Sequence, residues 1–154
     1  MVKGGGANWG TLVPRFLLGM VFVFHGGQKL FGLFGAPAGM IHDLSKYIEG
    51  WGWPMPVPMA YAVGVAEFFG GACVLLGLMT RFAAFSLVAT MVVAAWKVHW
   101  GHGFGGDGKA AGWEYNFVLG ILALSLVVSG GGAFSMDEMF FRGKKKASEP
   151  PEKE

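Results

Sequence analysis

Three polar side chains stand close together in an apolar stretch near the start of the chain. His25, Gln28 and Lys29 follow the almost uninterrupted apolar run of residues 16–24. If this segment is one helix, the three side chains share a face, because residues three and four positions apart are helical neighbours. A polar stripe on such a helix must meet partners inside the protein instead of lipid. One interpretation of this stripe is a polar pocket for the head of a small amphipathic molecule.

The partners expected for this stripe are the other ionisable groups in apolar surroundings, namely Glu67, His99 and Glu114. Glu67 lies about nine residues into its segment, which corresponds to a depth of roughly 13 Å in a helix. An isolated ionised side chain at mid-bilayer costs ~2.5–3.5 kcal/mol, so Glu67 must be paired, protonated or hydrated. Lys29 or His25 is the expected partner. The candidate ligand-binding residues are His25, Gln28, Lys29, Glu67, His99 and Glu114.

Three interpretations of this cluster stay open. The polar groups could hold the helices together without doing chemistry, or they could form the pocket described above. A third interpretation is haem ligation, which requires two imidazoles such as His25 and His99 to face each other. His102 and Asp107 lie in a glycine-rich loop and are expected to be solvated, so no metal site is predicted.

The composition is that of a membrane protein. Apolar residues make up 53% of the 154 residues and charged residues only 14%, whereas soluble domains carry roughly 25% charged residues. The net charge of +2 is too small to indicate nucleic-acid binding. The single cysteine, Cys73, excludes an internal disulfide and a CxxC redox pair. Electrons would therefore have to come from a cofactor or from a redox partner protein.

The apolar pattern predicts an all-α fold, an integral membrane four-helix bundle. The expected helices cover residues 11–33, 59–79, 82–100 and 113–129, and Thr80-Arg81 is expected to be the short turn of an antiparallel hairpin. Residues 35–58 should form an interfacial loop with a possible short helix and two tryptophans. We divide the chain into a retained cytoplasmic lead-in (1–10), the membrane domain (11–137) and a charged cytoplasmic tail (138–154).

The distribution of basic residues predicts the orientation in the membrane. With four spans, both termini lie on one side, and that side holds eight Lys and Arg residues against four on the other. Because basic residues favour the cytoplasmic side, the termini are expected in the cytoplasm of a multi-pass inner membrane protein. Five of the six tryptophans then fall at the outer interface, where this residue type is enriched.

The chain resembles the DoxX family of small four-helix membrane proteins over about residues 13–137. The residues that carry the resemblance are Arg15, the segments 24–30, 67–71 and 76–81, His99, Glu114 and the ending 130–137. Family members often have Asn shortly before the glutamate that corresponds to Glu114, where this chain has Gly112-Trp113. They often end in Ser-Leu-Asp, where this chain has Met136 in place of the leucine. The resemblance implies a bacterial-type cytoplasmic membrane protein. It also suggests quinone-linked redox work, since the family takes its name from a subunit of a thiosulfate:quinone oxidoreductase.

Two functional hypotheses follow. In the first, the chain is a redox-associated membrane subunit: His25 and Lys29 donate hydrogen bonds to a quinone head, and Glu67 or Glu114 moves protons. In the second, it is a non-enzymatic scaffold or small-solute-binding protein with a structural polar network. An open cavity lined by the polar cluster favours the first, and a closed, fully paired network favours the second. The lipid bilayer is the expected surrounding in both, and association into a homo-oligomer is compatible with either.

Overall fold

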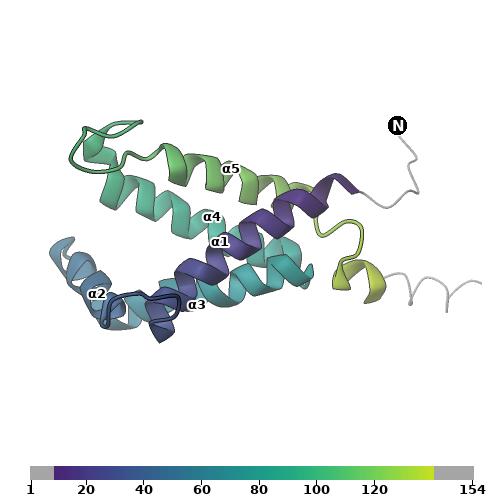
Figure 1. The fold of residues 1–154 in the computed structure, drawn as a ribbon, viewed down its shortest axis with the longest axis horizontal. Coiled ribbons are helices and arrows are strands. Elements are labelled where there is room, and N and C mark those ends of the chain that lie inside the picture. Colours follow the sequence, from purple (N-terminus) through teal and green to yellow (C-terminus); the bar gives the residue numbers. More distant parts are fainter. Residues whose placement is uncertain (1–8, 141–154) are drawn as a thin grey trace, which may run out of the picture.

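The computed structural model describes residues 9–140, and all regular structure in this part of the chain is helical. Four long helices lie alongside one another: α1 (Leu12–Phe31), α3 (Pro56–Leu76), α4 (Thr80–Ala94) and α5 (Glu114–Ser129). The short helix α2 (Met40–Gly50) lies at one end of the molecule, next to α3 (Figure 1). The loop over residues 103–113 lies at the same end, which we call the loop end. The lead-in to residue 8 and the tail from residue 141 are outside the described residues.

Helices α1 and α3 pack against each other with their backbones in close contact. A Cβ atom on Gly26 would lie 2.3 Å from the backbone nitrogen of Phe68, and one on Gly71 would lie 2.8 Å from the backbone nitrogen of Val23. Such distances leave no room for a side chain, so these glycines are what allows the two helices to approach. The approach fixes which residues of α1 and α3 face each other.

The hairpin between α3 and α4 is antiparallel, but its turn lies earlier than the sequence pattern indicates. Helix α3 ends at Leu76, and Gly77 follows with φ of 68°, a left-handed conformation that glycine adopts without strain. The connection is residues 77–79, while Thr80 and Arg81 already belong to α4. The expected turn at Thr80-Arg81 is therefore wrong. Helix α4 can begin there because a remote carboxylate, Asp137, caps its first amides.

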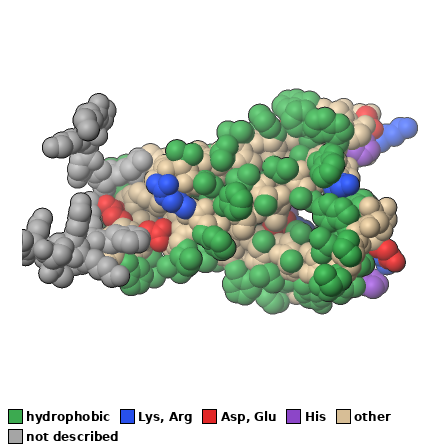
Figure 2. All heavy atoms as spheres, turned by 180° about the vertical axis from the view of Figure 1, so that it is seen from behind, with side chains coloured by type: hydrophobic (Ala, Val, Ile, Leu, Met, Phe, Trp, Pro, Cys, Tyr) green, Lys and Arg blue, Asp and Glu red, His purple; other side chains and the backbone are tan. Residues whose placement is uncertain are grey.

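Three helical segments are long and apolar enough to cross a membrane. They cover Trp9–Phe31, Pro56–Leu76 and Thr80–His102, and Glu114–Ser129 is a shorter apolar helix. The third segment is not α-helical throughout, because α4 continues into a π-helical turn over Ala95–His99 and a 3₁₀ turn over Trp100–His102. Hydrophobic side chains cover most of the face seen in Figure 2, and charged side chains gather near its two ends. Many large apolar residues, such as Phe82 and Val128, have exposed side chains, as expected where lipid is the neighbour.

Arg15 of α1 is buried at the end opposite the loop end. Its guanidinium group donates hydrogen bonds to the carbonyls of Val74 and Leu75 at the end of α3, at 3.2 and 3.1 Å. It also donates to the carbonyls of Gly131 and Ala133, at 2.8 and 3.0 Å. The arginine thus joins the start of α1, the end of α3 and the segment after α5. It is 3% exposed, so it does not act as a surface charge.

We expect Asp137→Ala to lower the free energy of unfolding by about 1–2 kcal/mol, the usual effect of removing a helix cap. The Asp137 carboxylate accepts hydrogen bonds from the amides of Met79 and Thr80, at 2.7 and 2.9 Å, and from the Thr80 hydroxyl at 2.8 Å. The measurement is denaturant unfolding in detergent micelles. Asp137→Asn keeps an acceptor oxygen and should lose less, and equal losses in the two variants would contradict the capping role.

Candidate functional site

A cavity of about 600 Å³ opens towards the loop end between the α2–α3 side and the α4–α5 side of the molecule. Figure 2 shows the surface hollowed there between two groups of hydrophobic side chains. Most of the lining is apolar, from residues such as Phe22, Ile48 and Leu119. A few polar side chains interrupt it: His25, Lys29, Glu67, Ser86, Thr90, His99, Tyr115 and Asn116. A predominantly apolar pocket with a small number of polar groups is typical of sites for small organic ligands.

Lys29 and Glu67 form an ion pair in the wall of this cavity, between Nζ and Oε2. The Glu67 side chain is 6% exposed and that of Lys29 is 20% exposed, so both are largely removed from solvent. The close approach of α1 and α3 at Gly26 and Phe68 positions them, since each lies within one turn of that contact. The pairing satisfies the requirement that a carboxylate deep in an apolar segment must have a partner.

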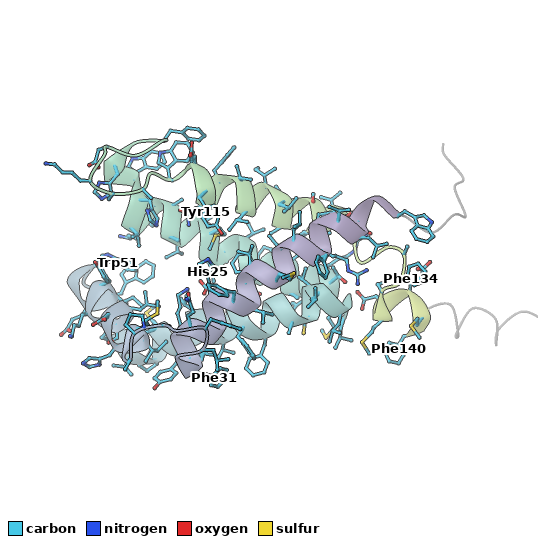
Figure 3. The ribbon with its side chains drawn as sticks, in the orientation of Figure 1. His25, Phe31, Trp51, Tyr115, Phe134 and Phe140 are labelled. Carbon is cyan, nitrogen blue, oxygen red and sulfur yellow. The ribbon has the colours of Figure 1, made fainter. Side chains whose placement is uncertain are left out.

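His25 lies one helical turn before Lys29 and faces the same space. It interacts electrostatically with both Lys29 and Glu67, so the three groups form one cluster. Figure 3 shows His25 of α1, Trp51 at the end of α2 and Tyr115 of α5 around the gap between the two sides of the molecule. The cluster therefore belongs to the cavity and not to the outer surface.

His99 joins the lining from the other side of the cavity, at the end of the π-helical turn. Its Nδ1 lies 3.0 Å from the carbonyl oxygen of Ala111. Because a carbonyl can only accept, Nδ1 carries the proton of this hydrogen bond, and Nε2 of the neutral ring is left as an acceptor. The π turn is a local widening of the helix that is common at functional sites.

Two neighbouring tryptophans belong to the lining of the cavity. Trp51 and Trp53 lie edge to face with centroids 5.5 Å apart, and both line the cavity. The Nζ atom of Lys97, in the π turn, lies 5.5 Å from the Trp53 ring centroid and 4.3 Å from that of Trp96. The contact with Trp53 connects the α2–α3 linker to the π turn that follows α4, whereas the contact with Trp96 stays within that turn. Both tryptophans of the loop predicted to be interfacial thus line the cavity.

The structure does not bring Gln28 and Glu114 into the cavity. Gln28 is partly buried with its side chain next to that of His25, outside the lining. Glu114 is exposed at the first position of α5, and its backbone amide donates to the carbonyl of Phe104 at 3.0 Å. A carboxylate at the N-terminus of a helix is favoured by the helix dipole.

Asn116 is one of four polar cavity residues that sequence reasoning missed; the others are Ser86, Thr90 and Tyr115. Asn116 is 6% exposed and lies on the face of α5 that packs against α4. The signal that could have found it is the helical spacing of the buried positions Asn116, Leu119, Ala123 and Leu126. A polar residue in register with this apolar stripe must face the interior, whereas Glu114 is out of register with it.

A second, smaller cavity of about 390 Å³ lies between α4 and α5. Aromatic residues of the loop end line it, including Trp96, Trp100 and Trp113. Met91 and Asn116 border both cavities, so these two side chains form the partition between them.

His102 and Asp107 pair within the loop at the loop end, with His102 Nδ1 2.9 Å from Asp107 Oδ2. The other oxygen of Asp107 accepts from the amides of Lys109 and Ala110, both at 2.9 Å. The expectation that both side chains are simply solvated thus misses a local bond, although both stay partly exposed. Over residues 9–140, no group of three or more His, Cys, Asp or Glu residues could hold a metal ion.

Asp107 should titrate below an ordinary aspartate. The hydrogen bonds from His102 and from the two amides hold the pKa of Asp107 well below its usual value. Because the folded-state pKa is depressed, the stabilisation of the loop is present above pH 4 and is lost only as the pH falls through the depressed value. The carboxyl carbon chemical shift of Asp107, followed by NMR against pH, measures this. A midpoint near 4 would contradict it.

The comparisons with known proteins agree with this architecture. The DoxX family model matches residues 10–100. The chain is 27% identical over 139 residues to a Bacillus subtilis protein named "Putative oxidoreductase CatD", which covers 90% of this chain and 92% of the relative. It is 32% identical over 114 residues to a Haemophilus influenzae protein of unassigned function, and this alignment covers 67% of this chain and 82% of the relative. It is 28% identical over 130 residues to the Escherichia coli inner membrane protein YqjF, and this alignment covers 84% of this chain and 91% of the relative.

No solved structure matches the chain. The family match covers more than half of the sequence, and the apolar helices and the inner-membrane relative agree with it. The chain belongs to the DoxX family and is a multi-pass protein of the inner membrane.

Proposed function

We propose that this protein is a membrane subunit of a quinone-linked oxidoreductase and that its cavity receives the quinone head. The observation that carries the proposal is the cavity itself: about 600 Å³ of largely apolar space in which His25, Lys29, Glu67 and His99 converge. Structural pairing alone does not require an open space beside the paired groups.

The chemistry of the lining suits a quinone. Trp51 and Trp53 offer aromatic surface to a flat ring, and the apolar walls suit its substituents. His25 and Lys29 donate hydrogen bonds to a ring oxygen, while Glu67 exchanges a proton with Lys29 or with the ligand. Reduction of a quinone to a quinol takes up two electrons and two protons, so an ionisable pair beside the ring oxygens can pass on the protons that the reaction consumes.

The electrons come from a partner protein in this proposal. Cys73 is the single cysteine of the chain and packs beside the apolar core, so no thiol pair within the chain can supply them. The name of the Bacillus subtilis relative, an oxidoreductase, supports a redox setting. This chain then provides the membrane-embedded site, and a second subunit provides the reducing power.

We further propose that the four long helices form a membrane bundle with the termini in the cytoplasm. Helix α5 has 16 residues and a length of about 24 Å, so it needs its flanking residues to cross a hydrocarbon core of about 30 Å. Arg15 and Arg81 belong to the end that would be cytoplasmic, and Lys29, Lys46, Lys97 and Lys109 to the loop end. The cavity then opens to the outer half of the membrane.

A second candidate function is a scaffold whose polar groups only fasten helices. The direct pairing of Glu67 with Lys29 favours it, because both charges are already compensated without a ligand. In this candidate the cavity holds lipid, and replacing its polar residues changes the yield of the protein or of its complexes but no binding reaction.

The test is equilibrium binding of a short-tailed 1,4-benzoquinone to the full chain in lipid nanodiscs. We expect saturable binding that His25→Ala weakens about tenfold, as loss of one hydrogen bond in a dry site would. His42→Ala, an exposed histidine of α2 outside the lining, is the matched control and should bind normally. Binding equal in wild type and His25→Ala, or no binding at all, would overturn the proposal. An absorption spectrum of the same sample tests haem held by His25 and His99.

A further inference from the structure

Asn116 has a polar side chain that the described part of the protein leaves almost without partners. Its Nδ2 lies 3.7 Å from the sulfur of Met91, which is a weak acceptor. Among residues 9–140 no hydrogen bond reaches its Oδ1. The residue is nonetheless only 6% exposed, and the large majority of buried side-chain polar atoms have at least one hydrogen-bond partner.

The oxygen of this amide is not enclosed by protein atoms. No side-chain oxygen or nitrogen in the described residues is both fully buried and without a partner, so Asn116 Oδ1 must reach open space. Asn116 lines the main cavity and also borders the smaller one. The main cavity is the one that also contains His25, Lys29, Glu67 and His99, so a ligand bound at these polar groups would lie in a space that Asn116 lines.

Asn116 belongs to a different wall from the ion pair. Lys29 and Glu67 come from α1 and α3, whereas Asn116 comes from α5. In Figure 3 the neighbouring residue Tyr115 lies across the gap from Trp51, with His25 between the two sides. The cavity therefore offers polar groups on two walls, with apolar surface such as Phe22 and Leu119 between them.

The two walls offer different chemistry. The ammonium group of Lys29 can only donate hydrogen bonds, whereas a carboxamide donates through its NH₂ group and accepts through its oxygen. A ring carbonyl needs a donor, and a ring hydroxyl also needs an acceptor. Asn116 can serve both forms without changing its charge, which suits a ligand that alternates between them.

We propose that Asn116 is the second polar anchor of the cavity and selects ligands with oxygen substituents on two opposite edges of a ring. One oxygen binds at His25 and Lys29, and the other binds the Asn116 amide. The inference rests on the proposed function and narrows it: a ring with a single oxygen fills the same space but leaves the amide without a partner. Asn116 is a specificity-determining residue in this scheme.

The experiment compares two ligands, an alkyl-hydroquinone and the alkyl-phenol that lacks its second hydroxyl, on the full chain in nanodiscs. Wild-type protein should bind the hydroquinone about tenfold more tightly than the phenol, because a site with a buried unpaired amide rejects the ligand that leaves it unpaired. Asn116→Leu, which keeps the number and branching of the side-chain heavy atoms and removes the amide, should bind both ligands equally. Its affinity for the phenol should stay within about twofold of the wild-type value.

Two further variants serve as a replacement for Asn116→Leu and as a control. Asn116→Ala removes the amide without adding a branched side chain and replaces Asn116→Leu if the latter does not fold. Ser125→Ala is the control, because Ser125 is a polar α5 residue that bonds only its own helix, at the Leu122 carbonyl, and lies outside the cavity. Ser125→Ala should keep the preference.

The outcomes separate this inference from the proposed function. If wild-type protein binds neither ligand, the quinone proposal fails and the role of Asn116 fails with it. If wild-type protein prefers the hydroquinone and the Asn116 variants keep that preference, only the role of Asn116 is overturned. Loss of the preference in the Asn116 variants, with unchanged phenol binding, supports both.

Discussion

Lys29→Met should destabilise the protein by about 3–5 kcal/mol, the usual cost of leaving one member of a buried ion pair without its partner. Glu67 is 4% exposed and bonds Lys29, so the variant leaves a carboxylate in apolar surroundings. Thermal and denaturant unfolding in detergent measure the loss. The matched control is Lys46→Met, which removes one member of the exposed pair Lys46–Asp43, at 3.6 Å. That change should cost no more than about 1 kcal/mol.

The double variant Lys29→Met/Glu67→Met decides between the two candidate functions. Removing both charges leaves no unpaired carboxylate in apolar surroundings, so the double variant should regain most of the stability that Lys29→Met loses. If the pair also serves a ligand, the stable double variant should still fail to bind the quinone. Full recovery of stability together with unchanged quinone binding would show that the pair only fastens helices. A double variant as unstable as Lys29→Met would contradict the burial argument itself.

Gly26→Ala should be the most damaging glycine-to-alanine change within α1 and α3, where its added Cβ makes the closest approach. The added Cβ would lie 2.3 Å from the backbone nitrogen of Phe68 and 2.6 Å from its Cα. Because backbone atoms cannot rotate away, α1 and α3 must separate, which places the cost at or above the ~3 kcal/mol upper end of ordinary overpacking. Separation also moves Lys29 away from Glu67, so quinone binding should fall with stability.

Gly27→Ala is the natural comparison for this change. It is the adjacent residue of the same helix, but its added Cβ meets the ring edge of Phe34 at 3.2 Å, and an exposed side chain can move. We expect a loss below about 1 kcal/mol, of the order of small strain that a side chain relieves. Melting temperatures of the two purified variants measure the difference. Similar values would show that the backbone contact between α1 and α3 is not a critical constraint.

Sequence reasoning succeeded where one segment alone determines the outcome. The apolar runs predicted four spanning helices, three of which are long and apolar enough to cross a membrane, and the possible short helix within residues 35–58 is α2. The cost of an isolated carboxylate named Lys29 or His25 as the partner of Glu67, and Lys29 forms the ion pair. The polar stripe in an apolar helix placed His25 on an inward face, and His25 lines the cavity.

Sequence reasoning failed where the outcome depends on the register of one helix against another. Glu114 and Asn116 lie two positions apart on α5, yet only Asn116 faces the cavity. Nothing in the local sequence predicts the π turn at Ala95–His99, which turns His99 towards the site. Arg15 was counted among the charges that set orientation, but its partners lie 59 or more residues away and bury it.

The arginine in α1 has a consequence for how the molecule is made. α1 is synthesised first, but Arg15 bonds the carbonyl of Gly131, which leaves the ribosome 116 residues later. The carbonyls of Val74 and Leu75 are made earlier, but those of Gly131 and Ala133 follow only after α5. Until then part of the guanidinium group has to stay hydrated, since an uncompensated charge is costly inside the hydrocarbon. The helix that is synthesised first therefore completes its contacts last.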